Sequence, residues 1–195
     1  NLFGLYRVTN ILAAASIALK LGVPLEDINT RIRTFQAPKM RSQVIRYDSV
    51  TVIEDCYNSS PTATKHVIHS LDISFPEKRR ILILGDMYEL GKWEEDYHRQ
   101  IGRECVMAMA DVVIGVGPRA AWIVDEIKHH SKLTTYSVDD VEETKEILLN
   151  EIYSEDVILL KGSRACRLER LMDWFESRPW NIQSRIAGNH ASNSD

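Results

Sequence analysis

Three short, continuous runs of Ile, Leu and Val constrain the fold of this chain most strongly. They read RILILG, VVIGVG and VILLKG, at residues 80–85, 112–117 and 157–162. Such runs are typical of parallel strands that are buried on both faces. Segments with a helical pattern separate them, as the crossover between two parallel strands requires. The sequence therefore predicts an α/β fold with a Rossmann-like, doubly wound and mostly parallel sheet.

The remaining elements of this α/β region follow from local patterns. The segments QVIRY and VTVIEDC flank a short DS turn, which predicts a β-hairpin at the N-terminal side of the sheet. LTTYSV, residues 133–138, predicts one more strand. Helices are expected at about residues 61–71, 93–109, 118–130, 140–152 and 164–176.

The first 37 residues have a different pattern, which predicts two helices. Apolar residues between Ile11 and Leu19 indicate a helix that ends at Gly22. A second helix is expected to open at Pro24. Its predicted buried stripe consists of Leu25, Ile28, Ile32 and Phe35.

The domain boundaries follow from changes in composition. Pro38 disfavours a helical conformation for the residue before it, so we place a boundary between residues 37 and 38. The α/β domain is expected at residues 38–180. The segment 181–195 is rich in Gly, Asn and Ser and is predicted to be a disordered tail.

Charge and cysteine content exclude several classes of protein. The net charge of -4 and the pI of about 5.9 give no general electrostatic drive towards nucleic acid or an anionic membrane. The three cysteines are odd in number and form no C-x-x-C pair, so neither a disulfide framework nor a zinc site is indicated. No apolar run approaches the roughly 20 residues that span a bilayer. We therefore expect a soluble, cytoplasmic monomer without a metal site of its own.

Polar groups gather where the predicted strands end. DCYNSSP, GDMYELG, GVGPR and KGSR each follow an apolar strand. In an open parallel sheet, ligands bind outside the carboxyl ends of the strands. These four segments are therefore the places at which to look for a site.

Six motifs stand in the order seen in Mur ligases, and these are TNILAAA, MRSQVI, EDCYNSSP, LGDMYELG, HRQIG and LLKGSR. The chain resembles the end of the central ATPase domain of that family followed by its C-terminal domain, and within the family it is most similar to members that use D-alanyl-D-alanine. The resemblance implies ATP-dependent amide-bond formation through an acyl phosphate in peptidoglycan synthesis, with ATP, Mg²⁺, a UDP-muramoyl peptide and D-alanyl-D-alanine as partners. It also implies that residues 1–37 are the helical end of a truncated central domain.

The resemblance implies a nucleotide site built from five residues. Asn10 would contact adenine, Arg41 the γ-phosphate region and Asp55 the ribose, while Tyr57 and Asn58 line the same edge. The chemistry of these side chains agrees, because an amide can pair with a base edge, a guanidinium fork with phosphate and an acid with a vicinal diol. The alternatives are an ordinary polar residue at a helix N-terminus for Asn10, a solvated surface residue for Arg41, and a turn-stabilising role for the other three.

A second group is implied on the side of the incoming dipeptide. Asp86 and Glu89 could bind an ammonium group or pair with a basic neighbour. Lys161, Ser163 and Arg164 are expected to converge where a carboxylate binds at the start of a helix, with Ser163 as its N-cap. The alternative is an ordinary capped helix with exposed basic residues.

Two features separate this chain from a complete enzyme of the family. No G-x-x-x-x-G-K-[ST] run is present, so the chain is not expected to turn over ATP alone, and the Mg²⁺ ligands are expected mainly outside it. Tyr6 and Arg7 stand where many Mur ligases have His-Asn. The rival functions are another Mur-type or folylpolyglutamate-type ligase, and a stand-alone nucleotide-binding regulatory module.

Overall fold

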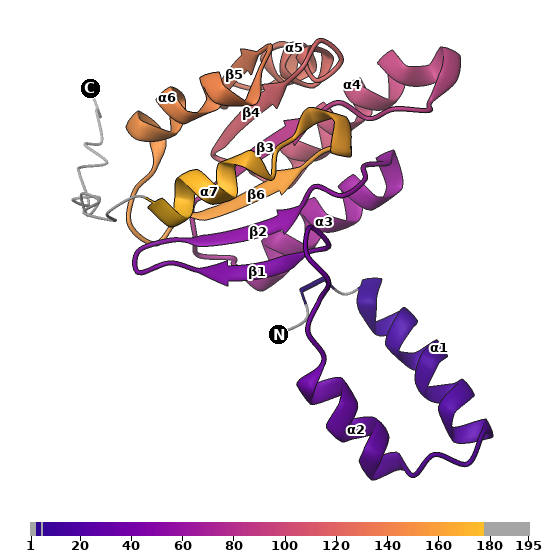
Figure 1. The fold of residues 1–195 in the computed structure, drawn as a ribbon. Coiled ribbons are helices and arrows are strands. Elements are labelled where there is room, and N and C mark those ends of the chain that lie inside the picture. Colours follow the sequence, from indigo (N-terminus) through magenta and orange to yellow (C-terminus); the bar gives the residue numbers. More distant parts are fainter. Residues whose placement is uncertain (1–2, 5, 178–195) are drawn as a thin grey trace, which may run out of the picture.

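A helical hairpin stands apart from an α/β sandwich in this protein (Figure 1). The computed structural model describes residues 3–4 and 6–177. The hairpin consists of α1 (Tyr6–Lys20) and α2 (Leu25–Thr34), joined by a turn in which Gly22 has a φ of 83°. Both predicted N-terminal helices are confirmed. The tail predicted at 181–195 lies outside the described residues.

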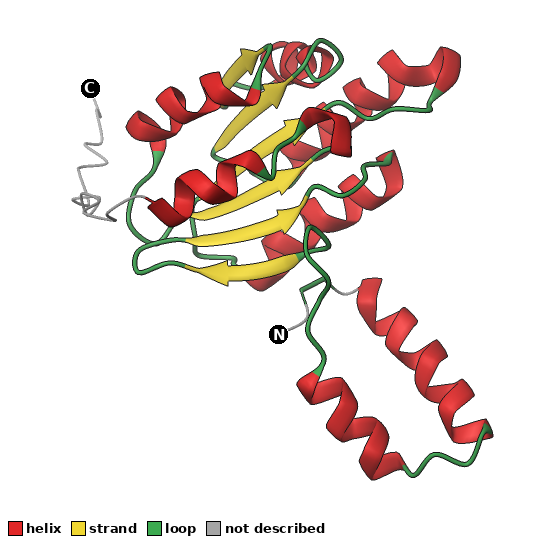
Figure 2. Ribbon diagram, in the orientation of Figure 1, coloured by secondary structure: helices red, strands yellow, loops and turns green. Residues whose placement is uncertain are grey.

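The sandwich is organised around one six-stranded sheet (Figure 2). Its strands are β1 (Gln43–Arg46), β2 (Thr51–Asp55), β3 (Arg80–Gly85), β4 (Val112–Val116), β5 (Thr134–Val138) and β6 (Val157–Lys161). Their order is β1-β2-β6-β3-β4-β5, and every neighbouring pair is parallel except the β1–β2 hairpin. The predicted hairpin and the mostly parallel sheet are both confirmed.

The position of β6 decides which strand ends meet. The last strand in sequence lies between β2 and β3, in the middle of the sheet. In the β2–β6 register, Asp55 is the partner of Lys161. Two of the predicted site residues, far apart in sequence, are therefore neighbours at the carboxyl ends of the parallel strands.

Helices cover both faces of the sheet. One face packs against α3 (Pro61–Ser74), α4 (Glu94–Met107) and α5 (Ala121–His130), and the other against α6 (Val141–Glu151) and α7 (Arg170–Ser177). Within β3, Leu82 and Leu84 belong to the first core, while Ile81 and Ile83 belong to the second. Each such side chain contributes about 1.5–3 kcal/mol on full burial, which explains why uninterrupted apolar runs form the central strands.

Local signals set the start of two helices. Ser60 caps α3 by accepting a hydrogen bond from the Ala63 N–H at 3.4 Å, and Pro61 occupies the first helical position. Asp140 and Glu143 form a capping box at the start of α6. The α3 cap marks where the segment that leaves β2 ends and the helix begins.

The helix predicted at 164–176 is interrupted, and this prediction needs correction. Arg164–Cys166 form a single 3-10 turn, η2, and α7 begins only at Arg170. Arg167 between them has a left-handed backbone with a φ of 52°. The break turns Leu168 into the core, where it is fully buried. A short 3-10 helix, η1 (Gly91–Trp93), likewise precedes α4.

The buried stripe predicted on α2 is largely wrong for the described residues. Ile28 is buried, but Leu25 is 60% exposed and Phe35 is 45% exposed. The apolar sides of α1 and α2 line an open groove of about 660 Å³. Since α1 is the only described helix that lies alongside α2, one side of the stripe remains uncovered (Figure 1).

None of the helices in the described part of the chain combines the length and the apolar character that crossing a bilayer requires.

Candidate functional site

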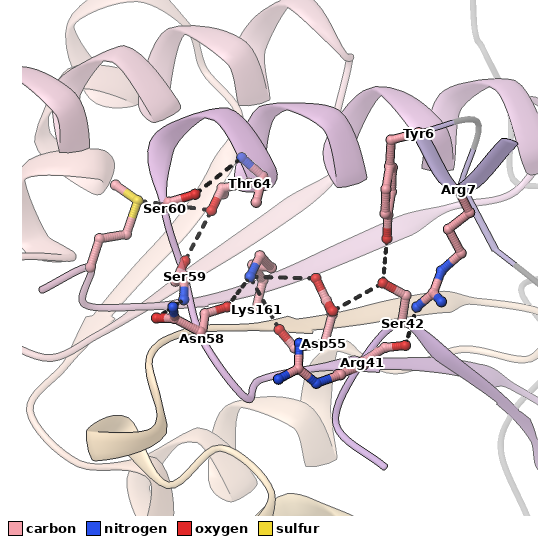
Figure 3. A network of polar contacts seen from close by, with 12 residues as sticks. Tyr6, Arg7, Arg41, Ser42, Asp55, Asn58, Ser59, Ser60, Thr64 and Lys161 are labelled. Atoms are coloured by element: carbon pink, nitrogen blue, oxygen red, sulfur yellow. Dashed lines mark hydrogen bonds and ion pairs between the residues drawn. The ribbon is translucent and has the colours of Figure 1, made fainter. Parts of the chain in front are cut away.

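A polar cleft of about 550 Å³ opens where α1 meets the carboxyl ends of β2 and β6. It lies at the strand ends, where the sequence predicts a ligand site. Six of the ten predicted site residues line it. These six are Asn10, Arg41, Asp55, Tyr57, Asn58 and Lys161. Figure 3 shows the hydrogen-bond network that connects several of them.

The carboxylate of Asp55 makes two contacts within this network, one through each oxygen. Its Oδ1 accepts a hydrogen bond from the Ser42 hydroxyl at 2.9 Å. Its Oδ2 lies 3.4 Å from the ammonium nitrogen of Lys161. The Asp55 side chain is 17% exposed, so the carboxylate is anchored in the protein and still reaches the cleft.

Lys161 is a buried cation that is bonded to the same segment. Its ammonium group donates to the backbone oxygens of Asp55, at 3.3 Å, and Asn58 (Figure 3). Burial lowers the pKa of Lys161, and the nearby Asp55 carboxylate opposes this shift. The sequence predicts that Lys161 converges with Ser163 and Arg164. The register of β2 and β6 instead directs it to Asp55 and Asn58.

Arg41 is presented by a short turn with an unusual backbone. The residues on either side, Met40 and Ser42, have left-handed φ values of 61° and 51°. Non-glycine residues pay a steric cost for this conformation, and such strain is concentrated at functional sites. The exposed Arg41 guanidinium lies over the Tyr57 ring, 4.1 Å from its centroid. Tyr57, in the loop after β2, therefore lies against the side chain that this turn presents.

Backbone contacts hold this turn in place. The Met40 N–H donates to Oε2 of the buried Glu54 at 3.1 Å. The Met40 carbonyl accepts from the Tyr57 N–H, also at 3.1 Å. Burial raises the pKa of Glu54, while the hydrogen bond from Met40 opposes that shift. The turn is thus a part of the sheet edge and not a free linker.

The first turn of α1 contacts the opposite side of the cleft. The Tyr6 hydroxyl is hydrogen-bonded to Ser42, and the Arg7 guanidinium donates to the carbonyl of Arg41 (Figure 3). Asn10, one turn later, is exposed on the wall of the cleft. Tyr6 and Arg7, where the resemblance led us to expect His-Asn, therefore lie within the site itself.

Asp86 has a buried, intramolecular role. Its Oδ1 accepts hydrogen bonds from the N–H groups of Arg119, at 2.9 Å, and Ala120, at 2.7 Å. The Arg119 guanidinium lies 3.7 Å from Oδ2. Of the two uses predicted for Asp86, pairing with a basic neighbour is the one observed. Glu89 is exposed, with a left-handed φ of 63°, and neither acid lines the cleft.

Ser163 and Arg164 flank the cleft without lining it. Ser163 occupies the N-cap position of η2, but its hydroxyl makes no capping hydrogen bond. This hydroxyl is buried and has no hydrogen-bond partner among the described residues. The Arg164 guanidinium lies 5.8 Å from the centroid of the Tyr57 ring, so Arg41 and Arg164 approach the same aromatic residue.

The remaining titratable groups of the described residues form no cluster of the metal-binding kind. Across residues 3–4 and 6–177, no three His, Cys, Asp or Glu side chains gather as a metal site would require. Cys56, Cys105 and Cys166 are free thiols, and burial raises the pKa of all three, that of Cys166 to about 11. His98 is buried and bonded to the backbone at both ring nitrogens.

Sequence reasoning missed several residues of the cleft. Ser42, Thr62 and His66 all line it, yet none of them was singled out. Ser42 stands next to Arg41 in the MRSQVI motif, which is the only signal that could have drawn attention to it. Its contact with Asp55 depends on the β1–β2 pairing and on a backbone angle that the sequence does not reveal.

The chain matches known proteins over most of its length. Residues 40–164 match the family described as "Mur ligase, glutamate ligase domain". UDP-N-acetylmuramoyl-tripeptide--D-alanyl-D-alanine ligase from Bacillus subtilis is 30% identical over 90% of this chain and 39% of its own length. The enzyme of the same description from Mycobacterium tuberculosis H37Rv is 31% identical over 87% of this chain and 38% of its own length.

A solved structure supports the same relationship. The crystal structure of the MurF ligase from Thermotoga maritima in complex with ADP has a TM-score of 0.74 and 28% identity, covering 89% of this chain and 38% of that one. The chain thus spans somewhat more than a third of the length of these relatives. The family match covers more than half of the chain, together with its sheet and its polar strand ends. The chain therefore belongs to the Mur ligase family.

Proposed function

We propose that this chain is part of an ATP-dependent ligase that adds D-alanyl-D-alanine to UDP-N-acetylmuramoyl-tripeptide in the synthesis of peptidoglycan precursors. The observation that carries the proposal is the cleft in which Asp55, Arg41 and Asn10 face one space from three different elements. Two relatives with this activity in their names match the chain over 90% and 87% of its length. The cleft would bind ATP.

Each part of the cleft suits one part of the nucleotide. The Asp55 carboxylate would accept hydrogen bonds from the ribose hydroxyls. The exposed amide of Asn10 would pair with the edge of adenine. The Arg41 guanidinium, supported by the Tyr57 ring at 4.1 Å, would bind phosphate oxygens and offset the charge that develops during transfer.

The reaction would proceed in two steps. A carboxylate oxygen of the muramoyl tripeptide attacks the γ-phosphorus of ATP, the bond to the leaving ADP breaks, and an acyl phosphate forms. The amine of D-alanyl-D-alanine then attacks the acyl carbon, phosphate leaves, and the nitrogen loses a proton. Mg²⁺ would supply charge neutralisation to the phosphates. Among the described residues, Asp55 is the only acid that lines the cleft, so we expect the Mg²⁺ ligands mainly outside these residues.

The acceptor would bind near η2, beside the cleft. The exposed Arg164 could pair with the carboxylate of D-alanyl-D-alanine, and the unpartnered Ser163 hydroxyl could add a hydrogen bond. Glu89 is exposed and could bind the ammonium group. Asp86 and Lys161 are buried and hydrogen-bonded within the protein, so they would support this region from the interior.

The setting of the reaction completes the proposal. The 195 residues contain no G-x-x-x-x-G-K-[ST] run, so we expect ATP cleavage to need residues outside them. The use of ATP and a UDP-linked precursor suits a cytoplasmic enzyme. We expect this enzyme to act as a monomer.

A ligation assay on the full-length product of the gene tests the proposal. The mixture contains ATP, Mg²⁺, UDP-muramoyl-tripeptide and D-alanyl-D-alanine, and the amide product is measured. Asp55→Ala and Arg41→Ala should each lower kcat/KM at least tenfold. Asp48→Ala and Arg46→Ala are matched controls, because both residues are exposed on the β1–β2 hairpin and do not line the cleft.

The outcomes separate the rival functions. Product formation with a different amine, but not with D-alanyl-D-alanine, would retain the chemistry and change the acceptor, as for another Mur-type or folylpolyglutamate-type ligase. Nucleotide binding without ligation of any acceptor would favour a regulatory module. Equal activity of Asp55→Ala and Asp48→Ala would remove the cleft from the mechanism.

A further inference from the structure

The carboxylate of Asp55 is oriented by two groups from different parts of the chain. Ser42 approaches from the turn before β1, and Lys161 from the end of β6. Both side chains are buried, with Ser42 1% and Lys161 2% exposed. Each contacts a different oxygen of the carboxylate (Figure 3). A carboxylate held in this way cannot rotate freely about its last bond.

The backbone at Ser42 makes its identity informative. A φ of 51° is costly for serine, whereas glycine adopts it freely. If only the shape of the turn mattered, glycine would be the better residue. The serine hydroxyl is what distinguishes the two, and it is the group that donates to Asp55.

The geometry of the carboxylate leaves room for a ligand. An ionised carboxylate has about four lone-pair sites. Ser42 and Lys161 use one on each oxygen, so one on each oxygen is left for a ligand in the cleft that Asp55 lines. Two adjacent acceptor sites match the two donors of a vicinal diol, such as the hydroxyls of ribose.

We propose that Ser42 and Lys161 are positioning residues that hold the Asp55 carboxylate ready for the vicinal diol of a nucleotide. The inference rests on the proposed function, in that the diol belongs to ATP. Ser42 acts through Asp55 and also holds the Tyr6 hydroxyl, and Lys161 acts through Asp55 and through the carbonyl of Asn58. Neither residue needs to touch the nucleotide.

Two nucleotides and two glycine variants test this inference. The full-length product of the gene is titrated with ATP and with 2′,3′-dideoxy-ATP, which lacks the diol. Ser42→Gly removes the hydroxyl and relieves the backbone strain. Met40→Gly relieves the same strain at a φ of 61° but leaves the Ser42–Asp55 bond in place.

The wild type is expected to bind ATP at least tenfold more tightly than dideoxy-ATP. Ser42→Gly should weaken ATP binding at least fivefold and dideoxy-ATP binding less than twofold, while Met40→Gly keeps the wild-type ratio of the two affinities. A merely structural role would weaken the binding of both nucleotides equally. That result, or a wild-type protein that binds both equally or neither, would overturn the inference.

Lys161 is tested in the same assay. Lys161→Met keeps an unbranched side chain as far as the ε position and removes the ammonium group, and it should also reduce the ATP preference at least fivefold. Lys78→Met is the control, because Lys78 forms an exposed pair with Glu155 at 2.8 Å and does not line the cleft. If Lys161→Met retains the full preference for ATP, Lys161 is not a positioning residue.

The outcomes for the two proposals are distinct. A wild-type protein that prefers ATP to dideoxy-ATP but forms no amide would contradict the ligase function and still support the positioning role. Active ligation together with an unchanged nucleotide preference in Ser42→Gly would support the ligase function and contradict the positioning role.

Discussion

The guanidinium group of Arg41 lies over the ring of Tyr57, with 4.1 Å between its central carbon and the ring centroid. The ring face attracts the cation without occupying its N–H donors. These donors therefore remain free for phosphate oxygens, and the arginine is restricted to one side of the cleft before any ligand binds.

The first prediction concerns this stacked pair. Tyr57→Phe keeps the ring and should leave ATP affinity near that of the wild type. Tyr57→Leu removes the ring and should weaken ATP binding about two- to fivefold, because an exposed cation–π contact contributes about 0.5–1 kcal/mol. Titration with a fluorescent ATP analogue measures both. Equal losses in the two variants would show that the Tyr57 hydroxyl, and not the ring face, matters.

The second prediction concerns the buried Asp86. Asp86→Ala leaves the N–H groups of Arg119 and Ala120 without their acceptor, so the free energy of unfolding should fall by about 2–3 kcal/mol. Asp139→Ala, at an exposed position, should change it by less than about 0.5 kcal/mol. Urea denaturation compares the two. An Asp86→Ala protein of wild-type stability and reduced ligase activity would instead indicate a direct role with the substrate.

The third prediction concerns Gly102, in the middle of α4. Helix propensity alone favours Gly102→Ala by about 1 kcal/mol. A methyl group there would lie 2.7 Å from the backbone oxygen of Ile123 and 2.8 Å from Cβ of Glu126, and overpacking of this kind costs about 1–3 kcal/mol. The Ile123 oxygen can move only with α5. We therefore expect net destabilisation in thermal unfolding, and a higher melting temperature would contradict the close packing of α4 and α5.

The fourth prediction concerns the pH dependence of stability. His98 Nε2 accepts from the Met87 N–H at 3.0 Å, and Nδ1 donates to the Glu94 carbonyl at 2.6 Å, so the ring is bonded as a neutral imidazole. Burial lowers its pKa below the ordinary value of 6.5. Below pH 6.5 the unfolded chain then binds a proton that the folded protein does not, and stability is lost as the pH falls.

His98→Gln provides the comparison for this effect, because glutamine does not titrate and all carboxylates are common to both proteins. Between pH 7.5 and 5.5 the wild type should lose more unfolding free energy than the variant, by no more than about 1.4 kcal/mol for each pH unit. Urea denaturation at the two pH values measures the difference. Equal losses would mean that His98 titrates alike in the folded and unfolded states.

Much of the fold could be predicted because it depends on local patterns. The β3 run RILILG is apolar on both faces, and its alternate residues do pack into two separate cores. The pair Ser60–Pro61 starts α3 where the capping pattern indicates. The prediction failed at Arg167, because a left-handed residue without glycine leaves no local sign.

The sequence by itself determined the strands and most of the helices, and it placed Asp55 at the end of a strand, where a ligand site was predicted. Only the tertiary structure decided which of the predicted site residues contact one another. Asp55 and Lys161 are 106 residues apart and meet because β6 lies between β2 and β3. The contact of Ser42 with Asp55 likewise requires the β1–β2 pairing and a strained backbone. Secondary structure depends on the periodicity of neighbouring residues, whereas strand order and register depend on the packing of the whole core, which no short stretch of sequence contains.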